Sequence, residues 1–260
     1  MCLIGWIWRP DAAERLLLIA NRDEFYDRPS QPLHWWDDAP ILGGRDLSAG
    51  GTWLGVSRSG RVAALTNYRQ PGGPRPGASS RGKLVSEFLA SGAPAREYAA
   101  QVCESAAHFN PFNLVLFDGE ELVGFESRRS RFVEIEPGVS GVSNADFFTP
   151  WPKLTSLTNA LAKLDRDRRS ADDTALMDLL QDEAVAPDDR LPDTGIPLER
   201  ERQLSPAFIR APGYGTRAST IVRHSAHGIT VSERTFANGV VSGGTQITFQ
   251  QTPAAARDRS

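Results

Sequence analysis

The second residue of the chain is a cysteine, and a polar motif follows it two short strands later. Cys2 stands behind Met1, and the motif reads Asn21-Arg22-Asp23-Glu24. If Met1 is removed, as is normal before a small residue, Cys2 carries a thiol and a free α-amine. The thiolate is the reactive form of cysteine, and the ordinary pKa values, about 8.5 for the thiol and about 7.7–8.0 for the amine, are close. Cys2 would therefore be a nucleophile that carries its own base.

A working site needs partners for this nucleophile. Asp23 is a candidate to hold the amine, Arg22 to lower the thiol pKa through its charge, and asparagine side chains to donate to an oxyanion. Neighbouring residues of a strand point to opposite faces. Arg22 and Asp23 therefore both face Cys2 only if the strand bends or bulges there; otherwise one of them is structural.

Several segments together resemble the NRDE family, also called the transport and Golgi organisation 2 family. The motif that names the family stands unaltered at residues 21–24. The other matching segments are Gly50-Gly51-Thr52-Trp53-Leu54-Gly55, Leu65-Thr66-Asn67-Tyr68-Arg69, Gly141-Val142-Ser143-Asn144 and Tyr214-Gly215-Thr216-Arg217. The resemblance thus covers most of the chain.

The chain is more distantly similar to cysteine-type N-terminal nucleophile hydrolases such as penicillin V acylase, which carry Arg-Asn-x-Asp where this chain has Asn-Arg-Asp. This resemblance implies an α+β fold, a four-layer αββα sandwich of two mainly antiparallel sheets. It also implies a set of site residues. The implied catalytic residues are Cys2, Arg22, Asp23, Asn67, Asn144 and Arg217, and the implied ligand contacts are Asn21, Trp53 and Tyr68.

Two functions follow from these resemblances. The first is hydrolysis of a C–N amide bond in a small molecule through Cys2, with no cofactor. The second, since the NRDE family is linked to haem trafficking, is a non-catalytic carrier of haem or another hydrophobic metabolite. Its axial ligand would be His34, His224 or Cys2. The histidine spacing fits no zinc site, and no Cys-x-x-Cys-His motif for covalent haem attachment occurs.

Composition narrows the remaining possibilities. With 260 residues, of which 40% are hydrophobic, the chain can form one large domain with a sizeable core. The net charge of −3 shows no excess of basic residues, which a general nucleic-acid-binding protein would need. No apolar run approaches a membrane span or a signal peptide, so we expect a cytoplasmic protein. Of the two cysteines, Cys103 extends a helical apolar stripe, which predicts a buried core thiol.

The apolar patterns alternate between hairpins and helices. Strands are expected at Cys2–Trp8, Arg15–Ala20, Thr52–Ser57, Arg61–Asn67, Asn113–Phe117, Glu121–Phe125, Arg131–Glu136, Gly138–Ser143, Thr216–His224, Ile229–Phe236 and Gly244–Gln250. Helices are expected at Gly82–Ser91, after Pro94, after Pro152 and near Asp172. Surface loops are expected at Pro71–Ser80, a possible lid, and at Glu183–Gln203, and Ala254–Ser260 should fray.

Glycine and tryptophan pairs allow two interpretations each. Gly50-Gly51 either shapes a pocket rim where the backbone approaches closely or forms a plain turn. Trp6 and Trp8 share a strand face with Cys2, and Trp35-Trp36 lies further along the chain. Both aromatic pairs are expected in the core, with an apolar ligand site as the alternative.

Overall fold

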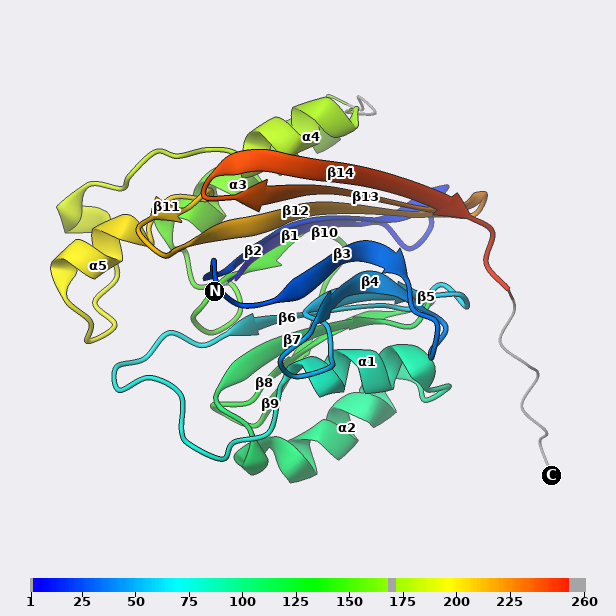
Figure 1. The fold of residues 1–260 in the computed structure, drawn as a ribbon. Helices are drawn as coiled ribbons and strands as arrows, with labels where there is room; N and C mark the ends of the chain where they lie inside the picture. The colour runs from blue at the N-terminus through cyan, green and yellow to red at the C-terminus, as the bar shows by residue number, and fades with distance from the viewer. Residues whose placement is uncertain (1, 168–171, 253–260) are drawn as a thin grey trace.

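Two antiparallel sheets form the centre of the molecule (Figure 1). The computed structural model describes residues 2–167 and 172–252. The first sheet runs in the order β10 (Gly138–Val142), β1 (Cys2–Trp8), β2 (Glu14–Phe25), β12 (Tyr214–Ser225), β13 (Gly228–Ala237) and β14 (Val240–Phe249), with the short β11 (Arg210–Ala211) beside β12. The second sheet runs in the order β3 (Ser30–Trp35), β4 (Ile41–Asp46), β5 (Leu54–Ser57), β6 (Val62–Asn67), β7 (Phe112–Phe117), β8 (Leu122–Glu126) and β9 (Arg131–Glu134).

Helices cover the outer face of each sheet, which makes four layers (Figure 1). α3 (Pro152–Arg166) and α4 (Asp173–Leu180) pack on the first sheet, and α1 (Gly82–Ala90) and α2 (Ala95–Ser105) pack on the second. The short α5 (Leu198–Gln203) lies at one end. The expected αββα sandwich of two antiparallel sheets is confirmed. Within the described residues, no helix is long and apolar enough to cross a bilayer.

β1 illustrates how the sequence creates these layers. Its seven residues are all buried, because both faces of the strand are covered. Ile4, Trp6 and Trp8 enter the core between the sheets, whereas Leu3 and Ile7 pack against the helices of the first sheet. Since successive side chains alternate between faces, one apolar run supplies two cores. Trp6 and Trp8 are confirmed as core residues.

Some of the expected elements were wrong, and other elements were not predicted. The strand expected at Gly138–Ser143 would continue an antiparallel meander from the preceding strand, β9; instead β10 crosses to the first sheet and pairs with β1. Three strands were missed. β11 has only two residues, Pro32 and a register shift interrupt β3, and paired glycines interrupt β4, which hides their alternation. The expected loop 183–203 contains α5. Cys103 is half-buried at the edge of its core rather than fully buried, and the tail 254–260 lies outside the described residues.

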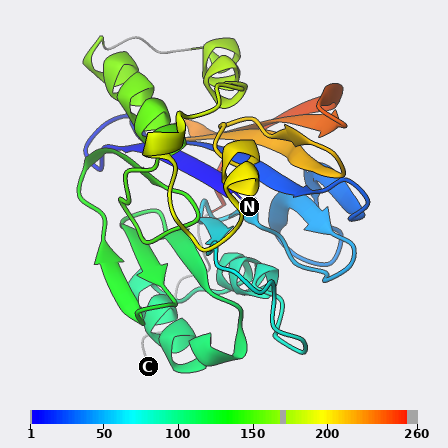
Figure 2. The same ribbon diagram turned by 90° about the vertical axis from the view of Figure 1, so that its left-hand side faces the viewer.

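Gly51 brings two segments into close contact beside the end of the sandwich where β1 begins. A Cβ on Gly51 would lie 2.4 Å from the carbonyl carbon of Gly82, so only glycine fits without a backbone shift. Of the two interpretations of Gly50-Gly51, the close backbone approach applies to Gly51, whereas Gly50, with a φ of +78°, lies in a turn. Seen from the side, this end is flanked by α5 and by the segment 71–80 (Figure 2).

Candidate functional site

A cavity of about 580 Å³ opens between the two sheets at the end where β1 begins. Both sheets and the segment 74–82 contribute to its wall. Six residues of the site expected from sequence line it: Cys2, Arg22, Asp23, Trp53, Asn67 and Arg217. In the described part of the chain, the other three are not among its lining residues: Asn21, Tyr68 and Asn144.

Cys2 is the first residue of β1 and is only 5% exposed. It lies directly opposite Arg22 in β2, and cross-strand partners of an antiparallel pair share a face. Burial, together with the charge of Asp23, raises the pKa of the Cys2 thiol to about 11, and the charge of Arg22 partly opposes this shift. At neutral pH this thiol is protonated, so it needs a base to become a nucleophile.

Asp23 follows Arg22 within an uninterrupted strand that runs to Phe25, so its side chain leaves the other face of β2, although the residue still borders the cavity. Its carboxylate accepts a hydrogen bond from Thr216 Oγ1 at 2.8 Å. Burial raises the pKa of Asp23, and the nearby charge of Lys153 is the largest influence that lowers it. The register shift at this place lies in the partner strand β12, between Thr216 and Ala218, and brackets Arg217.

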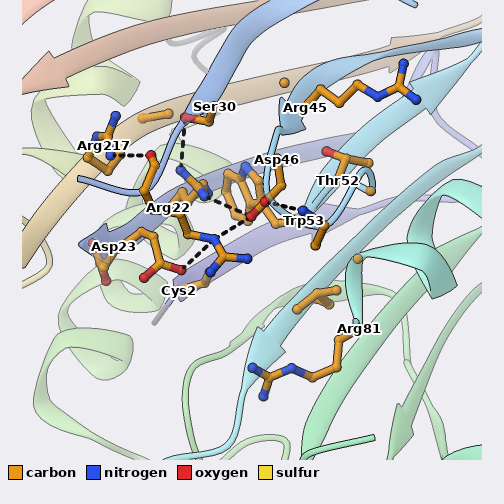
Figure 3. A pocket seen from close by; sticks show the side chains of 18 of the residues that line it. Cys2, Arg22, Asp23, Ser30, Arg45, Asp46, Thr52, Trp53, Arg81 and Arg217 are labelled. Atoms are coloured by element: carbon orange, nitrogen blue, oxygen red, sulfur yellow. Dashed lines mark hydrogen bonds and ion pairs between the residues drawn. The ribbon is translucent and has the colours of Figure 1, made fainter. Parts of the chain in front are cut away.

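The two expected arginines occupy the first-sheet side of the cavity (Figure 3). Arg22 lies 3.6 Å from Asp46. Arg217 Nη1 donates to the carbonyl oxygens of Phe25, Tyr26 and Arg28 at 2.9, 3.1 and 3.2 Å. Arg217 therefore fixes the turn after β2 with one nitrogen and leaves its other N–H groups for the cavity.

Asn67 lines the cavity at the end of β6, and Asn144 contacts the backbone of Asn67. Asn144 Nδ2 donates to the Asn67 carbonyl oxygen at 2.8 Å. Ser143, the neighbour of Asn144, donates to the Cys2 carbonyl oxygen at 3.3 Å. The segment after β10 thus positions the backbone of both Asn67 and Cys2.

The three expected ligand contacts lie in different surroundings. Trp53 lines the cavity and packs against the cores on both faces of the second sheet. Asn21 is fully buried on the helix side, where its amide donates to the carbonyl oxygens of Leu180 and Ala207 at 2.7 and 2.8 Å. Tyr68 accepts a hydrogen bond from Arg128. Neither Asn21 nor Tyr68 is among the residues that line the cavity.

Lys153, a buried lysine near Asp23, was missed in the sequence analysis. Lys153, 5% exposed, donates to the Leu204 carbonyl oxygen at 3.1 Å, and burial lowers its pKa to about 8. Arg69 and Glu201 form a buried ion pair beside it. One signal was available: Lys153, Leu157 and Leu161 recur at a spacing of four, which places Lys153 on the buried side of α3.

Arg81 was also missed, and no pattern in the sequence marks it. It follows the Gly/Pro-rich segment and immediately precedes α1. The Arg81 side chain lies on the opposite side of the cavity from Arg22 and Arg217 (Figure 3).

The site offers few donors for a metal or a haem iron. No group of three or more His, Cys, Asp or Glu that could hold a metal occurs among the described residues. His224 pairs with Leu16, six residues along β2 from the partner of Cys2, which corresponds to roughly 20 Å. Within residues 2–167 and 172–252, no histidine lines the cavity. An axial ligand there would have to be the buried Cys2.

A solved structure with a similar overall fold is that of the C2A mutant of conjugated bile acid hydrolase from Clostridium perfringens. Its TM-score is 0.52 over 97% of this chain and 98% of that chain, at 10% sequence identity. The likeness shows a shared fold of the N-terminal nucleophile hydrolase type.

Sequence comparison identifies much nearer relatives. The Transport and Golgi organization protein 2 homolog of Bos taurus is 37% identical over 259 residues, which cover 90% of this chain and 92% of that protein. The Homo sapiens homolog is 36% identical over 256 residues, with the same coverage. The family model for Transport and Golgi organisation 2 matches residues 1–238. This chain therefore belongs to the transport and Golgi organisation 2 family, the NRDE family.

Proposed function

We propose that this protein hydrolyses the C–N amide bond of a small molecule, with Cys2 as the nucleophile. The observation that carries the proposal is the position of Cys2, which begins a central strand and lines a cavity opposite Arg22. Because burial raises the thiol pKa to about 11, attack requires a local base. Loss of Met1 would supply that base as the α-amine of Cys2, at the end of β1 beside Asp23.

The reaction would proceed through a thioester. Cys2 Sγ attacks the amide carbon while the α-amine takes the thiol proton. The tetrahedral intermediate then collapses, the C–N bond breaks, and the leaving nitrogen takes the proton from the α-ammonium group. Water, activated by the same amine, hydrolyses the thioester and restores the thiol. A free thiol is needed throughout, which fits the expected cytoplasmic compartment.

The surrounding residues would divide the remaining tasks. Asp23, buried and hydrogen bonded to Thr216, would hold the α-ammonium group. Arg22 would favour the thiolate by its charge. Asn67 would donate to the oxyanion, and its backbone is held by Asn144. Arg217 would add positive charge on the same side of the cavity.

The alternative is a carrier of haem or another hydrophobic metabolite, and the cavity fits it less well. Its wall carries six arginines and four carboxylic acids. Cys2, the one soft donor at the cavity, has a raised thiol pKa that disfavours the thiolate needed to ligate iron. A Soret shift that saturates at about one haem per chain would favour this alternative over hydrolysis.

The test compares chains that begin at Cys2 with chains that carry an uncleaved N-terminal extension. Mass spectrometry first establishes where each purified chain begins. A panel of small acyl amides is then assayed for release of the amine. We expect turnover only when Cys2 is the first residue, and a loss of at least about 10³-fold in Cys2→Ala.

Cys103→Ala is the matched control, because Cys103 is the other free cysteine and lies outside the cavity. It should keep full activity. Equal turnover by the wild type and Cys2→Ala, or by the free and extended chains, would refute the proposed mechanism.

A further inference from the structure

Positive charge dominates the wall of the cavity. Six arginines line it: Arg22, Arg28, Arg45, Arg75, Arg81 and Arg217. Against them stand four carboxylic acids: Asp23, Glu24, Asp46 and Glu233. Burial raises the pKa of both Asp23 and Glu233.

Within the described residues, three of these six arginines form ion pairs with carboxylates, two with groups of the cavity wall and one with Asp38 outside it. Asp46 lies 2.6 Å from Arg28 and 3.6 Å from Arg22. Arg45 forms a bidentate ion pair with Asp38, with both hydrogen bonds at 2.8 Å. These three guanidinium groups have partners without any ligand.

Arg81 differs from these three arginines, because its side chain donates a hydrogen bond to a backbone carbonyl oxygen rather than to a carboxylate. Arg81 Nη1 donates to Pro111 O at 3.1 Å, and no carboxylate of the described residues lies within 4.0 Å of it. A guanidinium group has five N–H donors, so most of its capacity remains. Burial lowers the pKa of Arg81, and the Cys2 thiolate and the carboxylate of Glu24, which lies more than 4.0 Å away, oppose that shift.

A half-buried cation with no carboxylate in direct contact costs stability, because its desolvation is only partly offset. Arg217, on the opposite side, donates to carbonyl oxygens and has no carboxylate within 4.0 Å in the part of the chain that the structure describes. The two arginines face the same cavity, with Cys2 on the first-sheet side (Figure 3). An anionic ligand would supply the missing counter-charge.

We propose that the molecule bound beside Cys2 carries a carboxylate or phosphate group, and that Arg81 binds this group. The proposal rests on the proposed amide hydrolysis and narrows its substrate class to anionic amides. Guanidinium matches both oxyanions through paired hydrogen bonds. The amide would then lie at Cys2 and the anionic end at the α1 side of the cavity.

Binding is measured first, because it does not depend on turnover. Calorimetry with Cys2→Ala compares N-hexanoylglycine with the neutral N-hexanoylglycinamide, and N-butylsuccinamic acid with N-butylsuccinamide. N-hexanoyl-O-phosphoethanolamine tests phosphate against carboxylate. We expect at least one anionic amide to bind about 10–100-fold more tightly than its neutral counterpart.

Arg81→Gln in the same background should abolish that preference. Arg45→Gln is the matched control, because Arg45 also lines the cavity but already pairs with Asp38, and it should change the ratio by less than about threefold. Equal affinity for charged and neutral amides would overturn the proposal, whether or not Arg81→Gln folds. An equal loss in Arg45→Gln would also overturn it, since Arg81 would then have no special part.

Turnover by the chain that begins at Cys2 separates the two proposals. If the anionic amides bind selectively but none is hydrolysed, the hydrolase proposal fails and the anion site stands. If amides are hydrolysed with no preference for charge, the hydrolase proposal stands and the anion site fails. If both proposals are correct, kcat/KM should be higher for the anionic amide than for its neutral counterpart. Arg81→Gln should bring the ratio of these two values close to one.

Discussion

His224 lies in the core between the two sheets, far along β12 from the cavity. It is 2% exposed, and its ring meets Phe117 edge to face at a centroid distance of 4.9 Å. Gln251 Nε2 donates to His224 Nε2 at 3.1 Å. Burial lowers the pKa of His224 to about 4, and the charge of Arg15 adds to this shift. The histidine is therefore neutral in the folded protein at neutral pH.

This residue should make the protein sensitive to acid. The unfolded chain binds a proton at His224 near pH 6.5, whereas the folded chain resists it to about pH 4. The free energy of unfolding should thus fall by up to about 3 kcal/mol as the pH drops through this window. Urea titrations at several pH values should show that His224→Gln flattens this slope, whereas His227→Gln, on an exposed turn, keeps it. An unchanged slope in His224→Gln would contradict the assignment.

Single residues of the site could be predicted from sequence only where a motif already placed them. Cys2, Arg22, Asp23, Asn67 and Arg217 do gather at one cavity. A motif does not reveal which face of a strand each side chain takes or which carbonyl group it meets in the fold. Proximity in the sequence therefore assigned Asn21 and Tyr68 to the site although they do not line the cavity, and it did not indicate Arg81, which does.

At the scale of elements, the site depends on how segments meet rather than on their types. Most strands and helices were predictable, because periodicity alone indicates them. The crossing of β10 was not, because its alternation fits either sheet equally well. That crossing brings Ser143 to Cys2 and Asn144 to Asn67, so the arrangement of the site follows from topology.

Gly51 provides a test at this scale. Gly51→Ala would drive a methyl group to 2.4 Å from the carbonyl carbon of Gly82, so the cavity rim must separate from α1. We expect a loss of about 1–3 kcal/mol in the free energy of unfolding. Gly92→Ala is the control, because an added Cβ there meets nothing within 4 Å, and it should change stability by less than about 0.5 kcal/mol. Equal effects of the two substitutions would exclude the close contact as their cause.

At the scale of the whole molecule, a buried ion pair joins the two halves of the sandwich behind the site. Arg69 follows β6 of the second sheet, and Glu201 belongs to α5, in the long connection between α4 and the first-sheet strand β12. Their side chains are 4% and 3% exposed. The Arg69 guanidinium group lies 4.5 Å from the ring centre of Trp151, and its backbone N–H donates to Asn144 O at 2.7 Å.

Because this pair is buried, removing one partner should destabilise the whole fold rather than one loop. Glu201→Ala leaves the guanidinium group of Arg69 in the interior without that carboxylate, which typically costs about 3–5 kcal/mol. Glu199→Ala, on the same helix but paired with Arg202 at the surface, should cost less than about 1 kcal/mol. Urea unfolding followed by tryptophan fluorescence measures both. Arg69→Met combined with Glu201→Leu should recover part of the loss, since it removes both charges. Without that recovery, the loss in Glu201→Ala would reflect packing of α5 rather than the ion pair that joins the sheets.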